Sequence, residues 1–133
     1  MITLSEKRYL KTRLQSIQYA LDGIKYILET QQNARIHLFF TLAVFILGFL
    51  FRITRMEWIT LVLTIGLVWA AELFNTAVEV MVDLISPERR ITAKICKDIS
   101  AGSVLVTASI SILVGLLIFG PLLWDWVRGI FWQ

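Results

Sequence analysis

Long apolar stretches alternate with short polar stretches along this chain. Residues 36–51, 58–84 and 99–124 each consist mainly of aliphatic and aromatic side chains. A helix needs about 20 residues to cross the roughly 30 Å hydrocarbon core of a membrane, and the first stretch reaches that length with one flanking turn. Lipid offers the backbone no hydrogen bonds, so segments this long are expected to be helices. The pattern predicts an all-α integral membrane fold with three spanning helices.

The N-terminal 34 residues follow a different pattern. Apolar side chains recur at alternating steps of four and three, which places them on one stripe of a helix. The stripe consists of Leu10, Leu14, Ile17, Leu21, Ile24 and Leu28. Because the remaining positions are mostly polar or basic, we predict an amphipathic surface helix in the membrane interface over residues 1–34; packing on other protein is the alternative. No uninterrupted apolar core precedes a small-residue cleavage site, so this is not a secretory signal.

The composition excludes a soluble domain. Of the 133 residues, 57% are hydrophobic and 17% are charged, whereas soluble domains are about 45–50% apolar and about 25% charged. A formal net charge of +3 is too small to indicate a nucleic-acid partner, and Cys96 is the only cysteine, so no intrachain disulfide can form. We predict a single membrane domain over residues 1–133, with the three-span region in residues 35–128.

Lysine and arginine are unevenly divided between the two predicted membrane faces. The segment up to Arg35 carries six and residues 89–97 carry four, against three on the opposite face. Basic residues favour the cytoplasmic side, so we expect the N-terminus and the second connection to lie there. Pro87 and Pro121 are expected to mark helix ends.

The second apolar stretch is interrupted by polar residues at helical spacing. Glu72, Asn75, Glu79 and Asp83 follow one another at steps of three, four and four. At about 100° per residue they share one narrow helix face. A carboxylate deep in a bilayer costs roughly 3 kcal/mol even on lenient scales, so these groups need cations, metal or water nearby. A purely structural alternative is an interhelical hydrogen bond through Asn75.

Charged residues also gather at the start of the third stretch, where Lys94, Lys97 and Asp98 lie. Oxygen ligands suit magnesium, which usually comes bound to phosphates, and lysine neutralises phosphate charge. A partly buried glutamate can serve as general base toward a lipid hydroxyl. Such groups fit phosphoryl transfer, which needs mainly positioning and charge stabilisation. A small oligomeric cation channel or transporter is the alternative, although the lysines would oppose a cation path.

Other signatures of catalysis are missing from the sequence. It contains no G-x-x-x-x-G-K-[ST] phosphate loop and no protein-kinase signature. His37 is the only histidine, so histidine and cysteine cannot form a zinc cluster.

The polar face carries a specific motif. Residues 72–83 read E-x-x-N-T-A-x-E-x-x-x-D and are followed by Lys97-Asp98 and Ala101-Gly102. This pattern resembles that of the bacterial diacylglycerol kinase and undecaprenol kinase family. Residues 19–23 and 33–37 fit the N-terminal part of the same family, so the resemblance covers roughly residues 19–119.

The resemblance implies an architecture and a reaction. The protein would be a homotrimer of three-span protomers in the bacterial cytoplasmic membrane, with composite active sites between protomers at the cytoplasmic boundary. Each site would transfer the γ-phosphoryl group of ATP to a lipid hydroxyl with Mg²⁺. The acceptor would be either undecaprenol or diacylglycerol.

The resemblance also implies roles for individual residues. Glu72 corresponds to the catalytic carboxylate, the general base, and Glu79 to a ligand of the magnesium ion that carries ATP. The residues that correspond to nucleotide contacts are Tyr19, Glu79, Glu88, Arg89, Arg90, Lys97 and Asp98. Asn75 and Asp83 fall within the motif and are expected to order the site.

Three positions depart from the family pattern. Gln31 stands where the family commonly has a second metal-binding glutamate, and Arg90 where many members carry histidine. Thr12 occupies the position of an expected basic residue, with Lys11 and Arg13 on either side. An amide oxygen can coordinate magnesium but brings no charge, so Gln31 predicts either a lower affinity for the metal ion or the replacement of this ligand by another carboxylate.

Overall fold

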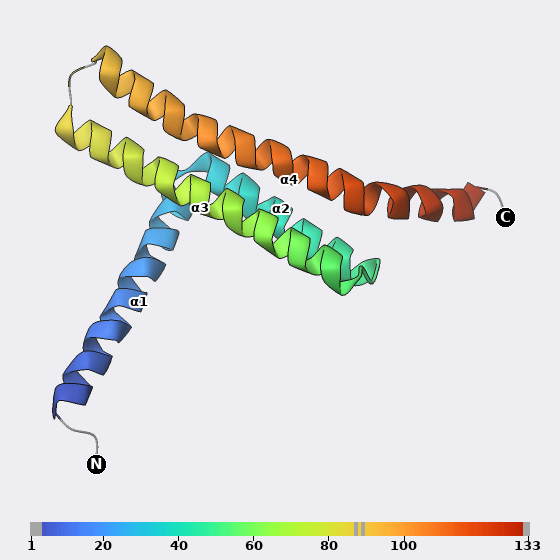
Figure 1. Cartoon of the computed structure of the whole chain (residues 1–133), viewed down its shortest axis with the longest axis horizontal. Helices are drawn as coiled ribbons and strands as arrows, with labels where there is room; N and C mark the ends of the chain where they lie inside the picture. Colours follow the sequence, from blue (N-terminus) through green and yellow to red (C-terminus); the bar gives the residue numbers. More distant parts are fainter. Residues whose placement is uncertain (1–3, 87, 89, 132–133) are drawn as a thin grey trace.

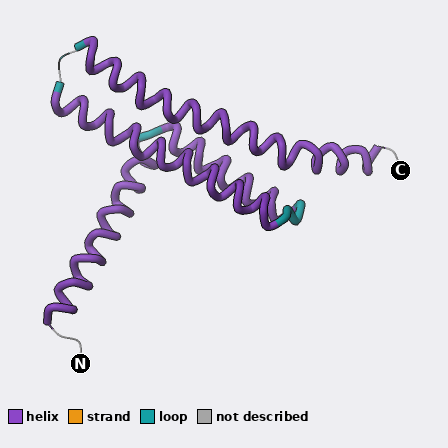
Figure 2. The backbone as a smooth tube through the Cα atoms, viewed as in Figure 1, coloured by secondary structure: helices purple, strands orange, loops and turns teal. Residues whose placement is uncertain are grey.

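The fold consists of four helices joined by short connections. A computed structural model describes residues 4–86, 88 and 90–131, and the side chains from Thr12 to Ile130 within these ranges. The helices are α1 (Leu4–Thr30), α2 (Gln32–Leu50), α3 (Arg55–Ile85) and α4 (Ile91–Phe131) (Figure 1). Among the described residues there is no strand (Figure 2). The predicted all-α fold is confirmed.

Three of these helices are long and apolar enough to cross a membrane, as predicted: Gln32–Leu50, Arg55–Ile85 and Ile91–Ile130. They form an antiparallel succession in which α3 and α4 lie side by side along much of their length, and α2 packs beside α3 (Figure 1). The N-terminal helix α1 projects away from them and contacts α2 and α3 (Figure 1).

The prediction that Pro121 ends a helix is wrong, because α4 continues through it to Phe131. Proline removes only one backbone hydrogen bond from a helix, and membrane helices tolerate that loss. Leu122, directly after the proline, still packs against the cluster of Ile53, Leu61 and Phe119. Packing on both sides of Pro121 therefore accompanies an unbroken helix. Pro87 lies outside the described residues.

The turn between α2 and α3 is tightly built. Thr54 accepts a hydrogen bond from the backbone N–H of Glu57, whose carboxylate accepts one from the backbone N–H of Thr54, which is a capping box. Arg52 adopts a left-handed φ of 49°. The indole of Trp58 lies directly over Gly48, where an added Cβ would come 2.7 Å from the ring. Gly48 is therefore required for this close approach.

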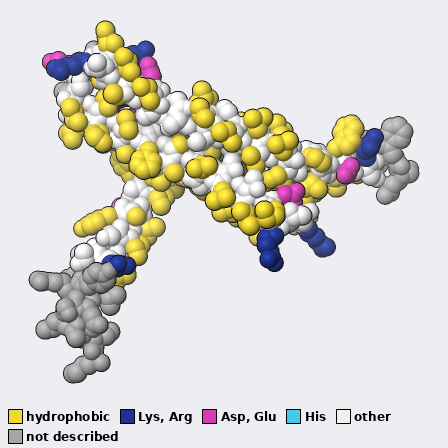
Figure 3. Space-filling model, in the orientation of Figure 1, with side chains coloured by type: hydrophobic (Ala, Val, Ile, Leu, Met, Phe, Trp, Pro, Cys, Tyr) yellow, Lys and Arg dark blue, Asp and Glu magenta, His cyan; other side chains and the backbone are white. Residues whose placement is uncertain are grey.

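Most apolar side chains of the spans point outward from the single chain. Figure 3 shows hydrophobic side chains over much of the visible surface of α2, α3 and α4, with charged side chains gathered toward the ends. The apolar stripe of α1 is also exposed at Leu14, Ile17 and Leu21, whereas Ile27, which is not part of the stripe, is buried near the C-terminal end of the helix. These surfaces are left for lipid or for other copies of the chain.

Candidate functional site

The polar face of α3 runs from the interior of the chain to its surface. Glu72 is 1% exposed and Asn75 is 7% exposed, whereas Glu79 is half-buried and Asp83 is exposed. The helix repeat fixes their common face, and packing against α4 decides how deeply each is buried. One end of this face is therefore a buried carboxylate, Glu72, and the other end is an exposed carboxylate, Asp83.

Glu72 is the most unusual residue of this face. Its Oε2 atom is buried and has no hydrogen-bond partner among the described residues, and the same holds for Oγ1 of Thr76 one turn away. Buried polar atoms are nearly always hydrogen-bonded in native proteins. The free lone pairs of Glu72 are therefore available to a proton or donor that comes from outside the chain.

Asn75 connects the face to α4. Its Nδ2 atom donates a hydrogen bond to Oε1 of Glu79, 3.2 Å away. The hydroxyl of Ser100 donates to Oδ1 of Asn75 at 2.8 Å, and its Oγ also lies 2.9 Å from the backbone carbonyl of Lys97. A chain of side chains on two helices therefore ends at the Glu79 carboxylate.

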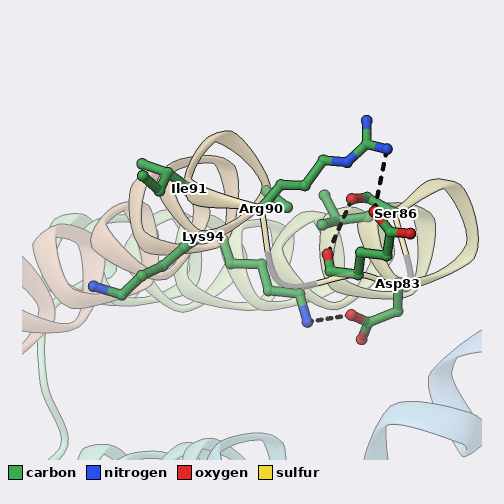
Figure 4. Close-up of a pocket in the computed structure, with 9 residues that line it drawn as sticks. Asp83, Ser86, Arg90, Ile91 and Lys94 are labelled. Atoms are coloured by element: carbon green, nitrogen blue, oxygen red, sulfur yellow. Dashed lines mark hydrogen bonds and ion pairs between the residues drawn. The ribbon is translucent and has the colours of Figure 1, made fainter.

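A cavity of about 320 Å³ opens where α3 ends and α4 begins (Figure 4). Its polar lining residues are Asp83, Ser86, Glu88, Arg90, Lys94 and Lys97. The ammonium group of Lys97 contacts the Asp83 carboxylate at 2.5 Å, and the Arg90 guanidinium lies 3.4 Å from Glu88. Three basic side chains therefore line this cavity together with two carboxylates.

The remaining predicted residues are distributed more widely. Asp98 is paired with Lys94 at 3.5 Å beside the cavity but does not line it. Tyr19 is 70% exposed on α1 and is not part of the cavity either. Gln31 is half-buried at the break between α1 and α2, where it is the N-cap residue of α2 without a side-chain cap bond. Arg89 lies outside the described residues.

The register of α2 against α3 places Gln31 and Glu79 at a similar height. The indole N–H of Trp69 donates to the Thr41 hydroxyl at 3.1 Å. Thr41 is nine residues from the start of α2 and Glu79 is ten residues from Trp69, so the two rises are about 14 and 15 Å. Glu72 then lies about 10 Å deeper than Glu79 along the helix axis.

The donor set around Glu79 suits magnesium that arrives on a nucleotide. Among the described residues, no three histidine, cysteine or acidic side chains gather as a metal cage. Magnesium is usually held by one or two carboxylates together with substrate phosphates and water. A half-buried carboxylate with one oxygen bonded to Asn75, one turn before the cavity residue Asp83, fits that mode.

A profile of the prokaryotic diacylglycerol kinase family matches residues 18–119. The chain belongs to this family. The match includes the whole polar face of α3, the cavity at the α3–α4 turn and Ser100. Family membership makes the chain a lipid kinase, an enzyme that uses ATP as phosphate donor, and a bacterial membrane protein. A cation channel and a structural protein, the alternatives left open by the residues alone, are thereby set aside.

Three relatives within this family show how far the similarity extends. The chain is 42% identical to an undecaprenol kinase of Bacillus subtilis over 106 residues, which cover 80% of this chain and 86% of the relative. It is 41% identical to a diacylglycerol kinase of Synechocystis over 112 residues, 83% of this chain and 64% of the relative. A diacylglycerol kinase of Haemophilus influenzae is 32% identical over 108 residues, 80% of this chain and 92% of the relative.

Sequence reasoning on this kinase missed parts of the site. Ser86 lines the cavity and Ser100 bonds Asn75, yet neither was given a role in the site from the sequence, whereas Lys94 was noted there only as a charge at the start of the third stretch. Lys97 stands one turn before Ser100 and Lys94 almost two turns before it, so the spacing at steps of three was a usable signal for Ser100. Ser86 lies at the end of α3, in the polar connection 86–90, and its membership of that connection was the signal for it.

Proposed function

We propose that this chain transfers the γ-phosphoryl group of ATP to the hydroxyl of a membrane lipid alcohol at the cytoplasmic face, with Mg²⁺. The observation that carries the proposal is the continuous polar face from buried Glu72 to the basic cavity at Asp83 and Lys97. A lipid kinase needs one end of its site in lipid and the other in water. This face has both.

The orientation follows from charge and depth. Ten lysines and arginines lie on the side of the N-terminus and the α3–α4 turn, and three on the other, which favours a cytoplasmic N-terminus. If α2 begins at the membrane boundary, Glu79 lies at that boundary and Glu72 about 10 Å inside it. A lipid hydroxyl about 10 Å below that boundary would then be level with Glu72 while still inside the bilayer.

Glu72 is proposed as the general base. Its buried Oε2, which has no hydrogen-bond partner in the described part of the chain, would accept the proton of the lipid hydroxyl as the lipid oxygen forms its bond to the γ-phosphorus. The bond between that phosphorus and the β–γ bridging oxygen breaks, and ADP leaves. The absence of a competing donor at Oε2 within the described chain keeps this carboxylate ready for the substrate proton.

The cavity is proposed to hold the nucleotide phosphates. Lys97, Lys94 and Arg90 surround it, and each is paired with a carboxylate in this structure. Phosphate oxygens would replace those carboxylates as partners, with Glu88 and Asp98 remaining as nearby nucleotide contacts. Bound magnesium would supply charge neutralisation for the phosphates, and Glu79, with Gln31 as a neutral neighbour at similar height, would hold it.

A homotrimer is part of the proposal. One chain leaves most apolar side chains of its spans exposed, and its Tyr19 does not reach its own cavity. A neighbouring protomer could cover the exposed apolar side chains and contribute its Tyr19 to the cavity, which would make each site composite. We expect α1 to lie along the membrane surface with its apolar stripe toward lipid.

The test is lipid phosphorylation by the purified protein in mixed micelles. Undecaprenol and diacylglycerol are offered in parallel, because relatives named for these two lipids match this chain at 42% and 41% identity. We expect radiolabel transfer from γ-labelled ATP to one of them and its loss when EDTA removes the metal. A folded protein that labels neither lipid would contradict the proposal, and labelling that persists in EDTA would contradict its magnesium part.

A further inference from the structure

Ser100 lies on α4 one turn after Lys97. It is half-buried, and its hydroxyl faces two acceptors, Oδ1 of Asn75 at 2.8 Å and the backbone carbonyl of Lys97 at 2.9 Å. A hydroxyl has a single proton to donate. Which of the two acceptors requires the Ser100 proton depends on the orientation of the Asn75 amide.

The orientation of the Asn75 amide is determined by its two neighbours. Its amino group must face Glu79, since an ionised carboxylate only accepts hydrogen bonds, and the contact is 3.2 Å. Its carbonyl oxygen then faces Ser100. Asn75 is only 7% exposed, so without the Ser100 hydroxyl this oxygen would be a buried acceptor lacking a partner, which is costly.

We propose that Ser100 is a positioning residue that holds the Asn75 amide in place so that Asn75 holds the Glu79 carboxylate toward the nucleotide-bound metal ion. The inference rests on the proposed function of Glu79. A loss of the Ser100 hydroxyl frees the Asn75 amide to rotate, and the carboxylate loses one of its fixed orientations. Binding of the divalent ion weakens, whereas the proton transfer at Glu72 does not involve this contact.

The chain offers a matched control on the same helix. Ser103 is exposed and donates to the backbone carbonyl of Ser100 at 2.6 Å, within its own helix. A Ser103→Ala change removes a hydroxyl of the same type from α4 without touching the α3 face. Any general effect of losing a serine hydroxyl in this helix would appear in both variants.

The experiment compares Ser100→Ala, Ser100→Thr and Ser103→Ala with the unchanged protein in micelles. One readout is the Mg²⁺ concentration that half-activates lipid phosphorylation, together with kcat at saturating Mg²⁺. The second does not depend on turnover: Mn²⁺ binding is followed by electron paramagnetic resonance in the presence of an ATP analogue with a β–γ imido bridge. Thermal unfolding in the same micelles monitors folding.

For Ser100→Ala we expect the half-activating Mg²⁺ concentration and the dissociation constant for Mn²⁺ to rise about fivefold, which is the effect of losing one neutral hydrogen bond. We expect kcat within about twofold of the unchanged protein at saturating Mg²⁺, because Glu72 is untouched. Ser100→Thr keeps the hydroxyl and should restore the affinity. If threonine proves too bulky and the variant unfolds, Ser100→Cys, a near-isostere with a weak donor, should be intermediate.

Equal Mn²⁺ affinities of the Ser100→Ala and Ser103→Ala variants would overturn the inference. The inference would also be overturned if Ser100→Ala lowered kcat and thermal stability but left the metal affinity unchanged. If the unchanged protein phosphorylates no lipid, the proposed function fails. The Mn²⁺ measurement would still decide separately whether Ser100 supports the metal ligand.

Discussion

Replacing Glu72 by glutamine separates a catalytic role from a structural one. The side chain is 1% exposed and its Oε2 has no hydrogen-bond partner within the described residues. Glutamine has nearly the same shape, so packing is retained and no hydrogen bond to Oε2 is lost. The substitution removes the charge and the ability to take up a proton, and it places an amide NH₂ where one carboxylate oxygen was.

The expected effects on rate and stability have opposite character. A positioned general base contributes about 10²–10⁴ in rate, which corresponds to roughly 2.7–5.4 kcal/mol of barrier. A charge buried without a partner is unfavourable to the folded state, so its removal should leave the unfolding midpoint unchanged or higher. We therefore expect Glu72→Gln to lose at least about 99% of kcat while the protein remains folded and assembled.

The assay is lipid phosphorylation in mixed micelles, with thermal unfolding and size-exclusion chromatography on the same preparations. Glu57→Gln is the matched control, because it is the same change near the opposite end of α3, where Glu57 accepts hydrogen bonds from Thr54. It should lower the unfolding midpoint and leave kcat intact. Substantial activity of Glu72→Gln, or a loss of assembly that accounts for its inactivity, would refute the reasoning.

Three further changes test the turn, the cavity and the metal site. Gly48→Ala places a Cβ 2.7 Å from the Trp58 ring and should destabilise by about 1–3 kcal/mol in thermal unfolding, an effect that a Trp58→Leu background should abolish. Lys97→Met should reduce kcat/KM for ATP by about tenfold or more, since hydrogen bonds to charged groups are worth about 1.5–3 kcal/mol; an unchanged value in steady-state kinetics would exclude Lys97 from the phosphate site. Gln31→Glu should lower the Mg²⁺ concentration for half-activation by about tenfold, and a higher requirement would show that Gln31 does not face the metal site of Glu79.

The membrane helices could be predicted well because their cause is local. A long apolar stretch must be helical in lipid whatever it packs against, so the spans were found within a few residues of Gln32–Leu50 and Arg55–Ile85. The end of α4 was predicted wrongly. The helix continues through Pro121, where Phe119 and Leu122 on either side of the proline pack in the hydrophobic cluster. Local helix-breaking rules do not include such tertiary contacts.

The candidate site divides in the same way. The common face of Glu72, Asn75 and Glu79 follows from the helix repeat and is visible in the sequence. The hydrogen bond from Ser100 to Asn75 joins residues 25 positions apart, and the ion pair of Lys97 with Asp83 spans the α3–α4 turn. Both depend on how α4 slides and rotates against α3.

By itself the sequence determined that this is an all-helical membrane protein with a carboxylate motif of the lipid kinase family. Hydrophobic length and helical spacing are properties of single segments, so no neighbour is needed to infer them. Only the tertiary structure decided that Glu72 is buried with no hydrogen-bond partner for its Oε2 among the described residues, that a cavity forms at the α3–α4 turn, and that Ser100 donates a hydrogen bond to Asn75. Burial, cavities and interhelical hydrogen bonds are properties of pairs of helices, and the register of each pair is set by side-chain packing along their whole contact.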